Sequence, residues 1–132
     1  VNMEISSWQE TGQIPVTILQ LKGDLTTEEQ LVDKAQAVFQ DGARDIILDL
    51  GGVPYISSAG LRAIHVIYML LRSADPQDEE TAVRGIARGT YKSPHLKLVK
   101  PSRNGLKALT TSGYDLFLDI HDSIPKAVAS FK

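Results

Sequence analysis

The run DIILDL at Asp45–Leu50 constrains the fold of this chain more than any other feature of its sequence. Apart from its two aspartates, the run consists of isoleucine and leucine. A short apolar run of this kind is typical of a strand covered on both faces, as strands are in parallel sheets packed between helices. We therefore expect a buried strand at these residues.

Strand-like and helix-like runs alternate along the rest of the chain. Residues Met3–Trp8 and Val16–Leu21 contain β-branched side chains in partial alternation, and the turn-like Glu10–Gly12 separates them, which predicts a hairpin. Thr26 and Glu29 have the spacing of a capping box, which predicts that a helix begins at Thr26. The other expected elements are helices over Ser58–Ser73 and Ser102–Ser112, strands over His95–Val99 and Phe117–Ile120, and a last helix capped by Asp122 or Ser123.

The order of these elements, ββαβαβαβα, defines the expected fold class. Strands that alternate with helices pair in parallel through right-handed crossovers, so we expect an α/β fold with a mostly parallel mixed sheet. A chain of 132 residues is long enough to bury one core and too short for two. We therefore expect residues 1–132 to form a single domain.

The segment 75–94 is longer than the connections that usually join a helix to a strand. Connections of about two to six residues are usual, and this segment is several times longer. It begins acidic, turns basic and contains two glycines and two prolines. We expect a long flexible loop here, with a partner-docking element or a short extra helix as the alternatives.

Charge and composition exclude several classes of protein. A formal net charge of −2 gives no reason to expect the clustered basic surface of nucleic-acid-binding proteins. The absence of cysteine excludes disulfides and thiolate chemistry. The sequence also has no apolar run of membrane-spanning length and no secretory pattern at its start. We therefore expect a cytoplasmic protein with no nucleic-acid partner and no direct membrane insertion.

Two adjacent serines, Ser57 and Ser58, stand between the buried strand and the helix that follows it. Gly51 and Gly52 permit a sharp turn after the strand, and Pro54 has no N–H group with which to continue its pairing. Either serine could cap the helix by accepting a hydrogen bond from its first turn. The amino end of a helix also tolerates phosphate, so a hydroxyl here could act as a charge switch.

Enzymatic chemistry at the serine pair has less support. Ser58 and Gly60 match half of the G-x-S-x-G nucleophile elbow, but Ile56 replaces the first glycine and an α/β-hydrolase needs a larger sheet. The three histidines are scattered and lack the spacing of metal ligands, and the phosphate-binding P-loop pattern is absent. We therefore expect no catalytic residue, no metal and no cofactor.

The stretch around the serines resembles the STAS domain family, of the anti-sigma-factor antagonist type. The family pattern is a strand ending in DL, then G-V, and after two or three residues a serine-containing run ending in G-L that opens a helix. Asp49-Leu50, Gly52-Val53 and Ile56–Leu61 match this pattern in order and spacing. A second match, Leu21–Thr26, is similar to the G-x-L-D segment of the family, and a third is Leu96–Val99 with the helix after it.

The resemblance implies a protein that binds a partner and catalyses nothing. Members of the family bind an anti-sigma factor that is also a serine protein kinase, and they lose affinity when the serine at the helix start is phosphorylated. Ser58 falls on that serine, and a PP2C-type phosphatase is the enzyme implied to remove the phosphate. The implied partner-binding residues are Asp24, Thr26, Ser57, Ser58, Ala59, Gly60, Leu61, Arg62 and His65.

Two positions depart from the family pattern. Ser57 and Thr26 stand where many members carry aspartate, so two acidic residues near the switch are missing. Two alternative functions stay open: an accessory module of a membrane transport or lipid-transport system, and a stressosome-type assembly subunit. A homodimer also stays open.

Overall fold

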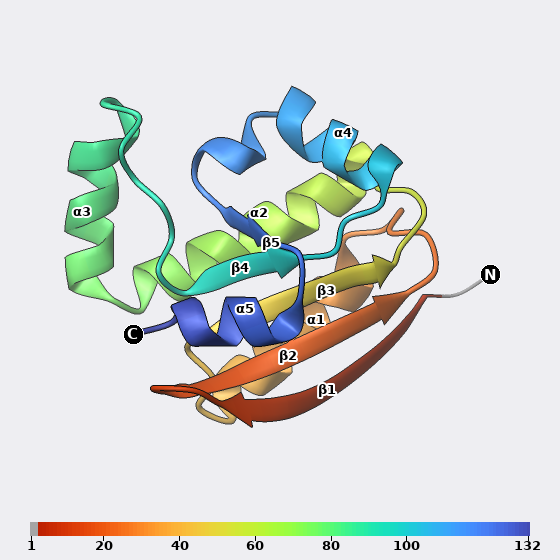
Figure 1. Ribbon diagram of the computed structural model, residues 1–132, viewed down its shortest axis with the longest axis horizontal. Coiled ribbons are helices and arrows are strands. Elements are labelled where there is room, and N and C mark those ends of the chain that lie inside the picture. The colour runs from red at the N-terminus through yellow and green to blue at the C-terminus, as the bar shows by residue number, and fades with distance from the viewer. Residues whose placement is uncertain (1–2) are drawn as a thin grey trace.

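Strand β3 (Ile46–Gly52) lies in the middle of a five-stranded sheet, where its apolar sequence places it. The computed structural model, which describes residues 3–132, orders the strands β1 to β5 across the sheet (Figure 1). β1 and β2 form the expected antiparallel hairpin, and β2 to β5 run parallel, which confirms the predicted fold class. The other strands are β1 (Glu4–Thr11), β2 (Pro15–Lys22), β4 (Leu96–Val99) and β5 (Asp119–His121).

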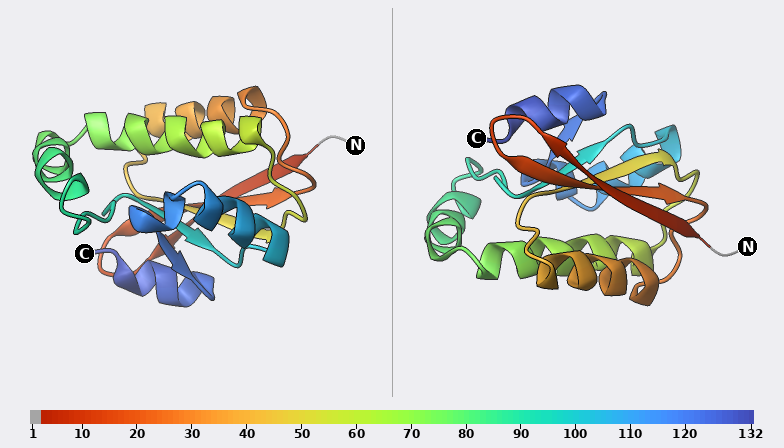
Figure 2. Two further views of the ribbon diagram at one scale, coloured as in Figure 1. Left: turned by 90° about the horizontal axis from the view of Figure 1, so that it is seen from above. Right: turned by 90° about the horizontal axis from the view of Figure 1, so that it is seen from below.

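Helices cover both faces of this sheet. α1 (Glu29–Gln40) and α2 (Ser58–Ser73) lie side by side on one face, and α5 (Ile124–Ser130) lies on the other (Figure 2). Successive side chains of a strand point to opposite faces, so β3 serves two cores. Its Leu48 packs in the larger core, under α1 and α2, whereas its Ile47 packs with α5.

The predicted positions of α2 and of α4 (Arg103–Thr111) are confirmed. α2 begins and ends at the predicted residues, Ser58 and Ser73. Ser102 caps α4 by accepting a hydrogen bond from the N–H group of Gly105 (3.0 Å). Gly113 ends α4 in the left-handed conformation, with a φ of 79°, which side chains rarely adopt.

The predicted start of α1 is wrong. Glu28 precedes the helix without a side-chain cap, so Thr26 and Glu29 form no capping box. Leu25 pairs with Ile56 in an isolated parallel bridge, and the chain runs on through Thr26 to Glu28 before α1 begins.

The last strand and helix also differ slightly from the prediction. β5 begins at Asp119, two residues after the predicted Phe117, because a single 3-10 turn, η1 (Tyr114–Leu116), precedes it. Ser123 caps α5 by accepting a hydrogen bond from the N–H group of Lys126 (3.3 Å), which decides between the two predicted caps. None of the helices found between residues 3 and 132 is long and apolar enough to span a membrane.

Helix α3 (Pro76–Ile86) replaces most of the loop expected at 75–94. Asp75 caps it by accepting a hydrogen bond from the N–H group of Gln77 (3.0 Å), and proline fits the first helical position, where no N–H group is needed. The loop prediction is wrong for these residues, and the short extra helix considered as its alternative forms instead. α3 follows α2 and lies beyond one end of the sheet (Figure 1). The mobility expected for the whole segment stays a prediction.

Candidate functional site

Ser57 is the cap of α2. Its backbone is extended, and its Oγ accepts a hydrogen bond from the N–H group of Gly60 (3.2 Å). The same hydroxyl donates to the carbonyl oxygen of Leu25 (3.3 Å), and the residue is half-buried. The Ser57 hydroxyl group therefore both donates and accepts a hydrogen bond within the fold.

Replacing Ser57 with alanine is expected to lower the free energy of unfolding by about 1 kcal/mol, within the 0.5–2 kcal/mol usual for the loss of a helix cap. Ser58→Ala is the matched control, because it removes a neighbouring hydroxyl that caps nothing, and its cost should stay within about 0.5 kcal/mol. Urea denaturation of the two variants measures the difference. Equal costs for both would contradict the assignment of Ser57 as the cap.

Ser58 is the first residue of α2 and is exposed. Across residues 3–132, its hydroxyl makes no hydrogen bond. The first-turn N–H groups of a helix give this end a partial positive charge, which stabilises an anion placed beside it. The Ser58 hydroxyl is thus accessible to an enzyme, and a phosphate on it would meet a favourable helix end.

Gly60 fixes the distance between the start of α2 and the segment before α1. It is buried, and a Cβ built on it would overlap the carbonyl oxygen of Leu25 and lie 2.8 Å from the Cγ of that leucine. Only glycine permits this close approach. The approach matters for the site because it holds Asp24 and Thr26, both exposed neighbours of Leu25, alongside the serine pair.

The other predicted site residues follow along the first half of α2. Ala59 and Leu61 are half-buried, whereas Arg62 and His65 are exposed. The carbonyl oxygen of Leu61 accepts a hydrogen bond from the Tyr114 hydroxyl (2.9 Å). The ring of His65 lies beside three aromatic rings, with centroids 5.9 to 6.5 Å away, in Tyr68, Tyr114 and Phe117. The fold therefore brings the predicted residues together around the amino-terminal half of α2.

Ser58 also lines a groove between α2 and α4, and no sequence pattern indicated the α4 half. The groove has a volume of about 550 Å³. A hydrogen bond of 3.2 Å, which the Ser102 hydroxyl donates to the carbonyl oxygen of Pro54, ties the start of α4 to the loop before α2. The residues that line the groove are Tyr55, Ile56, Ser58, Leu61, Asn104, Lys107, Ala108, Thr111 and Ser112.

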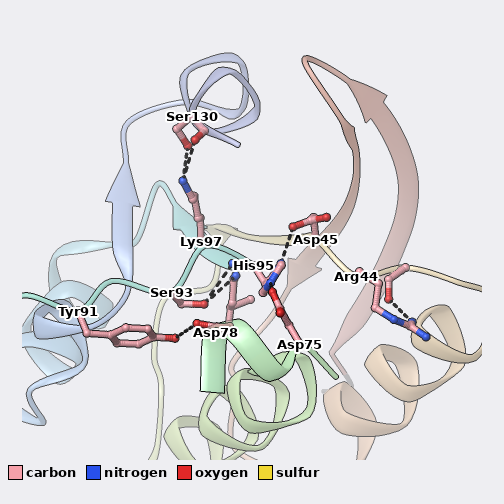
Figure 3. A network of polar contacts seen from close by, with 11 residues as sticks. Arg44, Asp45, Asp75, Asp78, Tyr91, Ser93, His95, Lys97 and Ser130 are labelled. Carbon is pink, nitrogen blue, oxygen red and sulfur yellow. Dashed lines mark hydrogen bonds and ion pairs between the residues drawn. The ribbon is translucent and has the colours of Figure 1, made fainter. Parts of the chain in front are cut away.

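A second cluster of titratable groups, drawn in Figure 3, lies at the opposite end of α2, where α3 follows it (Figure 1). His95 lies between two carboxylates, with its Nδ1 2.8 Å from Asp45 and its Nε2 2.8 Å from Asp75. These hydrogen bonds, first the one to Asp45, raise the pKa of His95 to about 9 against the opposing effect of burial. The imidazolium therefore donates from both nitrogens at neutral pH and has no proton left for a ligand.

The rest of this cluster is also internal to the fold. Tyr91 donates a hydrogen bond of 2.8 Å to the buried Asp78 of α3, and burial raises the pKa of that carboxyl group. Perturbed pKa values often mark functional sites, but ion-pair networks that hold elements together produce them too. Because its bonds join α3 to Asp45 and His95, the residues immediately before β3 and β4, we assign this cluster the role of fastening α3 to the sheet.

Comparisons with known proteins agree with the fold described above. A family model described as the STAS domain matches residues 7–77 of this chain. A search of curated proteins gave no match.

Three solved structures share the fold. A candidate anti-sigma factor antagonist from Thermotoga maritima has a TM-score of 0.67 at 22% identity, covering 95% of this chain and 93% of that one. An anti-sigma factor antagonist from Mycobacterium paratuberculosis has a TM-score of 0.64 at 15% identity, covering 97% and 94%. The Bacillus cell fate determinant SpoIIAA in its phosphorylated form has a TM-score of 0.60 at 19% identity, covering 96% and 100%.

Proposed function

Because this chain belongs to the STAS domain family, we propose that it is a cytoplasmic anti-sigma factor antagonist that binds an anti-sigma factor with serine kinase activity. In this proposal, the unphosphorylated protein binds the kinase, phosphorylation of Ser58 releases it, and a PP2C-type phosphatase restores binding. The observation that carries the proposal is the difference between the two serines. Ser57 caps α2, whereas the Ser58 hydroxyl is exposed and makes no hydrogen bond within residues 3–132.

Phosphorylation at Ser58 is compatible with the fold of this protein. A phosphate adds a charge of about −1.5 to −2 at pH 7. The helix end favours such an anion by about 0.3–1 kcal/mol, so the modified domain should stay folded. The same charge would oppose binding, because docking of a partner would remove water from the phosphate and would bring it close to groups of like charge. The switch would therefore act on the contact with the partner and leave the domain intact.

Binding without catalysis is the activity that this surface supports. Ser58 lacks the partner of a nucleophilic serine, since no histidine is hydrogen-bonded to it in the described part of the chain. His65, two turns further along α2, packs among aromatic rings, and His95 is held between two carboxylates. We therefore infer that Ser58 accepts a phosphoryl group from another protein.

Ser58→Asp and Ser58→Glu are expected to weaken binding of the anti-sigma kinase by about ten- to a hundredfold, which is about 1.4–2.8 kcal/mol, through like-charge and desolvation costs. Ser58→Ala should bind as the native protein does and should not respond to ATP. Ser57→Ala, which loses the cap and the hydrogen bond to the Leu25 carbonyl, should bind and switch. Titration calorimetry with candidate kinases of the same organism, together with phosphosite mapping, measures both effects.

Several outcomes would overturn this proposal. One is phosphate on Ser57 alone, and another is undiminished binding by the Ser58→Asp and Ser58→Glu variants. Affinity capture followed by mass spectrometry tests the alternatives independently. Recovery of transporter subunits, or of a large assembly with other STAS proteins, would favour the accessory or stressosome-type functions over the antagonist.

A further inference from the structure

The groove between α2 and α4 combines an apolar floor with a cationic rim. Ile56, which is buried, and the partly buried Leu61 and Ala108 supply apolar surface, and the exposed ring of Tyr55 stands at its edge. Tyr55 is 51% exposed, so its ring is available to a partner at this place. The groove therefore offers apolar surface to a side chain from another protein.

Among the residues that line this groove, Lys107 alone is charged. Arg62 lies exposed on α2, one turn after Ser58, and Asp24, which is also exposed near the start of α2, does not line the groove. Neither cation takes part in any of the ion pairs found over residues 3–132, and none of the lining residues is acidic. The chain as a whole carries a net charge of −2, so this surface is locally the reverse of the average. Unpaired cations beside apolar surface fit a partner that brings a carboxylate.

We propose that this groove receives a segment of the partner in which an aspartate or glutamate stands next to an apolar side chain. The apolar side chain would pack on Leu61 and Ala108 beside the Tyr55 ring, and the carboxylate would pair with Lys107. The inference rests on the proposed function, because the partner is the protein that Ser58 controls. It also gives the switch a physical basis, since a phosphate on Ser58 enters the same groove, repels the carboxylate and competes for Lys107.

A display library of short random peptides, panned on the whole unphosphorylated protein, tests this groove without the partner itself. We expect enriched peptides to carry an aspartate or glutamate beside leucine, isoleucine, phenylalanine or methionine. The affinity of a synthetic peptide of this sequence should fall about tenfold or more in Lys107→Glu and should weaken as salt is added. Chemical shift changes in the native protein should cover the first turns of α2 and the face of α4 that holds Lys107.

Lys126→Glu is the matched control, because it reverses an exposed charge on α5, on the opposite face of the sheet, and should leave peptide affinity unchanged. Enrichment of basic peptides, no enrichment, equal binding to Lys107→Glu, or shift changes elsewhere would each overturn the inference. Because no kinase takes part, such a failure leaves the Ser58 switch standing. Conversely, a protein that binds acidic peptides but shows no Ser58-dependent binding would retain the groove and lose the proposed function.

Discussion

Gly60→Ala is expected to lower the free energy of unfolding by about 2–3 kcal/mol, the cost of overpacking a site that cannot relax. In an ordinary helix this substitution is favourable by about 1 kcal/mol, because alanine restricts the unfolded chain more than glycine does. Here the added methyl group would meet the Leu25 carbonyl oxygen, which is backbone and is fixed by its own hydrogen bond from the N–H group of Ser57 (2.9 Å). The steric cost should therefore exceed the gain in propensity.

Gly105→Ala provides the matched control for this prediction. Gly105 occupies the same place in α4 that Gly60 occupies in α2, three residues after a serine cap whose Oγ accepts its N–H group. A Cβ on Gly105 would have its closest contacts at 3.2 and 3.3 Å, both with side-chain atoms and neither as close as the backbone contact of Gly60. Its substitution should change stability by less than about 1 kcal/mol. Urea denaturation of both variants makes the comparison, and equal costs would show that the approach of Leu25 to α2 is not the cause.

The elements that could be predicted from the sequence are those whose signals are local. The buried strand β3, the bounds of α2 and the position of α4 each depend on a few neighbouring residues. The start of α1 could not be predicted in this way. Leu25 pairs with Ile56, and nothing in the residues around Thr26 indicates that contact. A capping pattern at Thr26 and Glu29 is thus not used where the chain just before it pairs with a distant segment.

Helix α3 was expected only as an alternative to a loop, although its local signals are present. Asp75 followed by Pro76 is a good helix start, and acidic residues in the first turn with Arg84 in the last complement the helix dipole. Gly85 and Gly89, together with the length of the segment, favoured a loop. A distant contact adds to these local signals, because the His95 ring is hydrogen-bonded to Asp75, the cap of α3.

Half of the candidate site could be predicted, and half could not. The residues from Ser57 to His65 follow one another along a single helix, so the family pattern finds them together. Lys107 and the rest of α4 reach Ser58 because β3 and β4 are neighbours in the sheet, which places the helices that follow them side by side. That neighbourhood is a property of the topology, and no local sequence signal connects the two halves of the groove.

His95→Gln is expected to lower the free energy of unfolding by about 2–3 kcal/mol at pH 7. The pKa of His95 is about 9 in the folded protein and 6.5 for the unperturbed side chain, so protonation stabilises the fold. Each unit of difference corresponds to about 1.4 kcal/mol. The stabilisation is fully present below pH 6.5 and is lost as the pH rises towards 9, because the folded state then has to release a proton that the unfolded state has already lost.

Two carboxyl groups of this cluster, those of Asp75 and Asp78, change the stability of the fold in opposite directions as the pH falls. The hydrogen bond to His95 lowers the pKa of Asp75, so the contribution of Asp75 is present above its ordinary value of 3.8 and is lost as the pH falls below it. Burial raises the pKa of Asp78, so that group favours the folded state as it becomes protonated.

Denaturation by urea between pH 5 and 10 separates this contribution from others. The native protein should lose stability between about pH 6.5 and 9, and His95→Gln should lose much less over that range, so that the two curves converge in alkali. His65→Gln, at the exposed histidine of α2, is the control and should run parallel to the native protein. If the stability of His95→Gln depended on pH in the same way as that of the native protein, the His95 ring would not be held as a cation between Asp45 and Asp75.

The same variant tests whether α3 and the candidate site are independent. His95 fastens the amino end of α3, which lies at the far end of α2 from Ser58 (Figure 1). A region that loses contacts opens locally at a lower free energy than the rest of the fold. Amide hydrogen exchange in His95→Gln should therefore accelerate most over residues 76–86. Peptide and kinase binding at the groove should stay unchanged under conditions where the variant is folded. If binding is lost together with the hydrogen bonds of His95, α3 belongs to the surface that contacts the partner. Segment 75–94 would then contain the partner-docking element that was one of the alternatives predicted from the sequence.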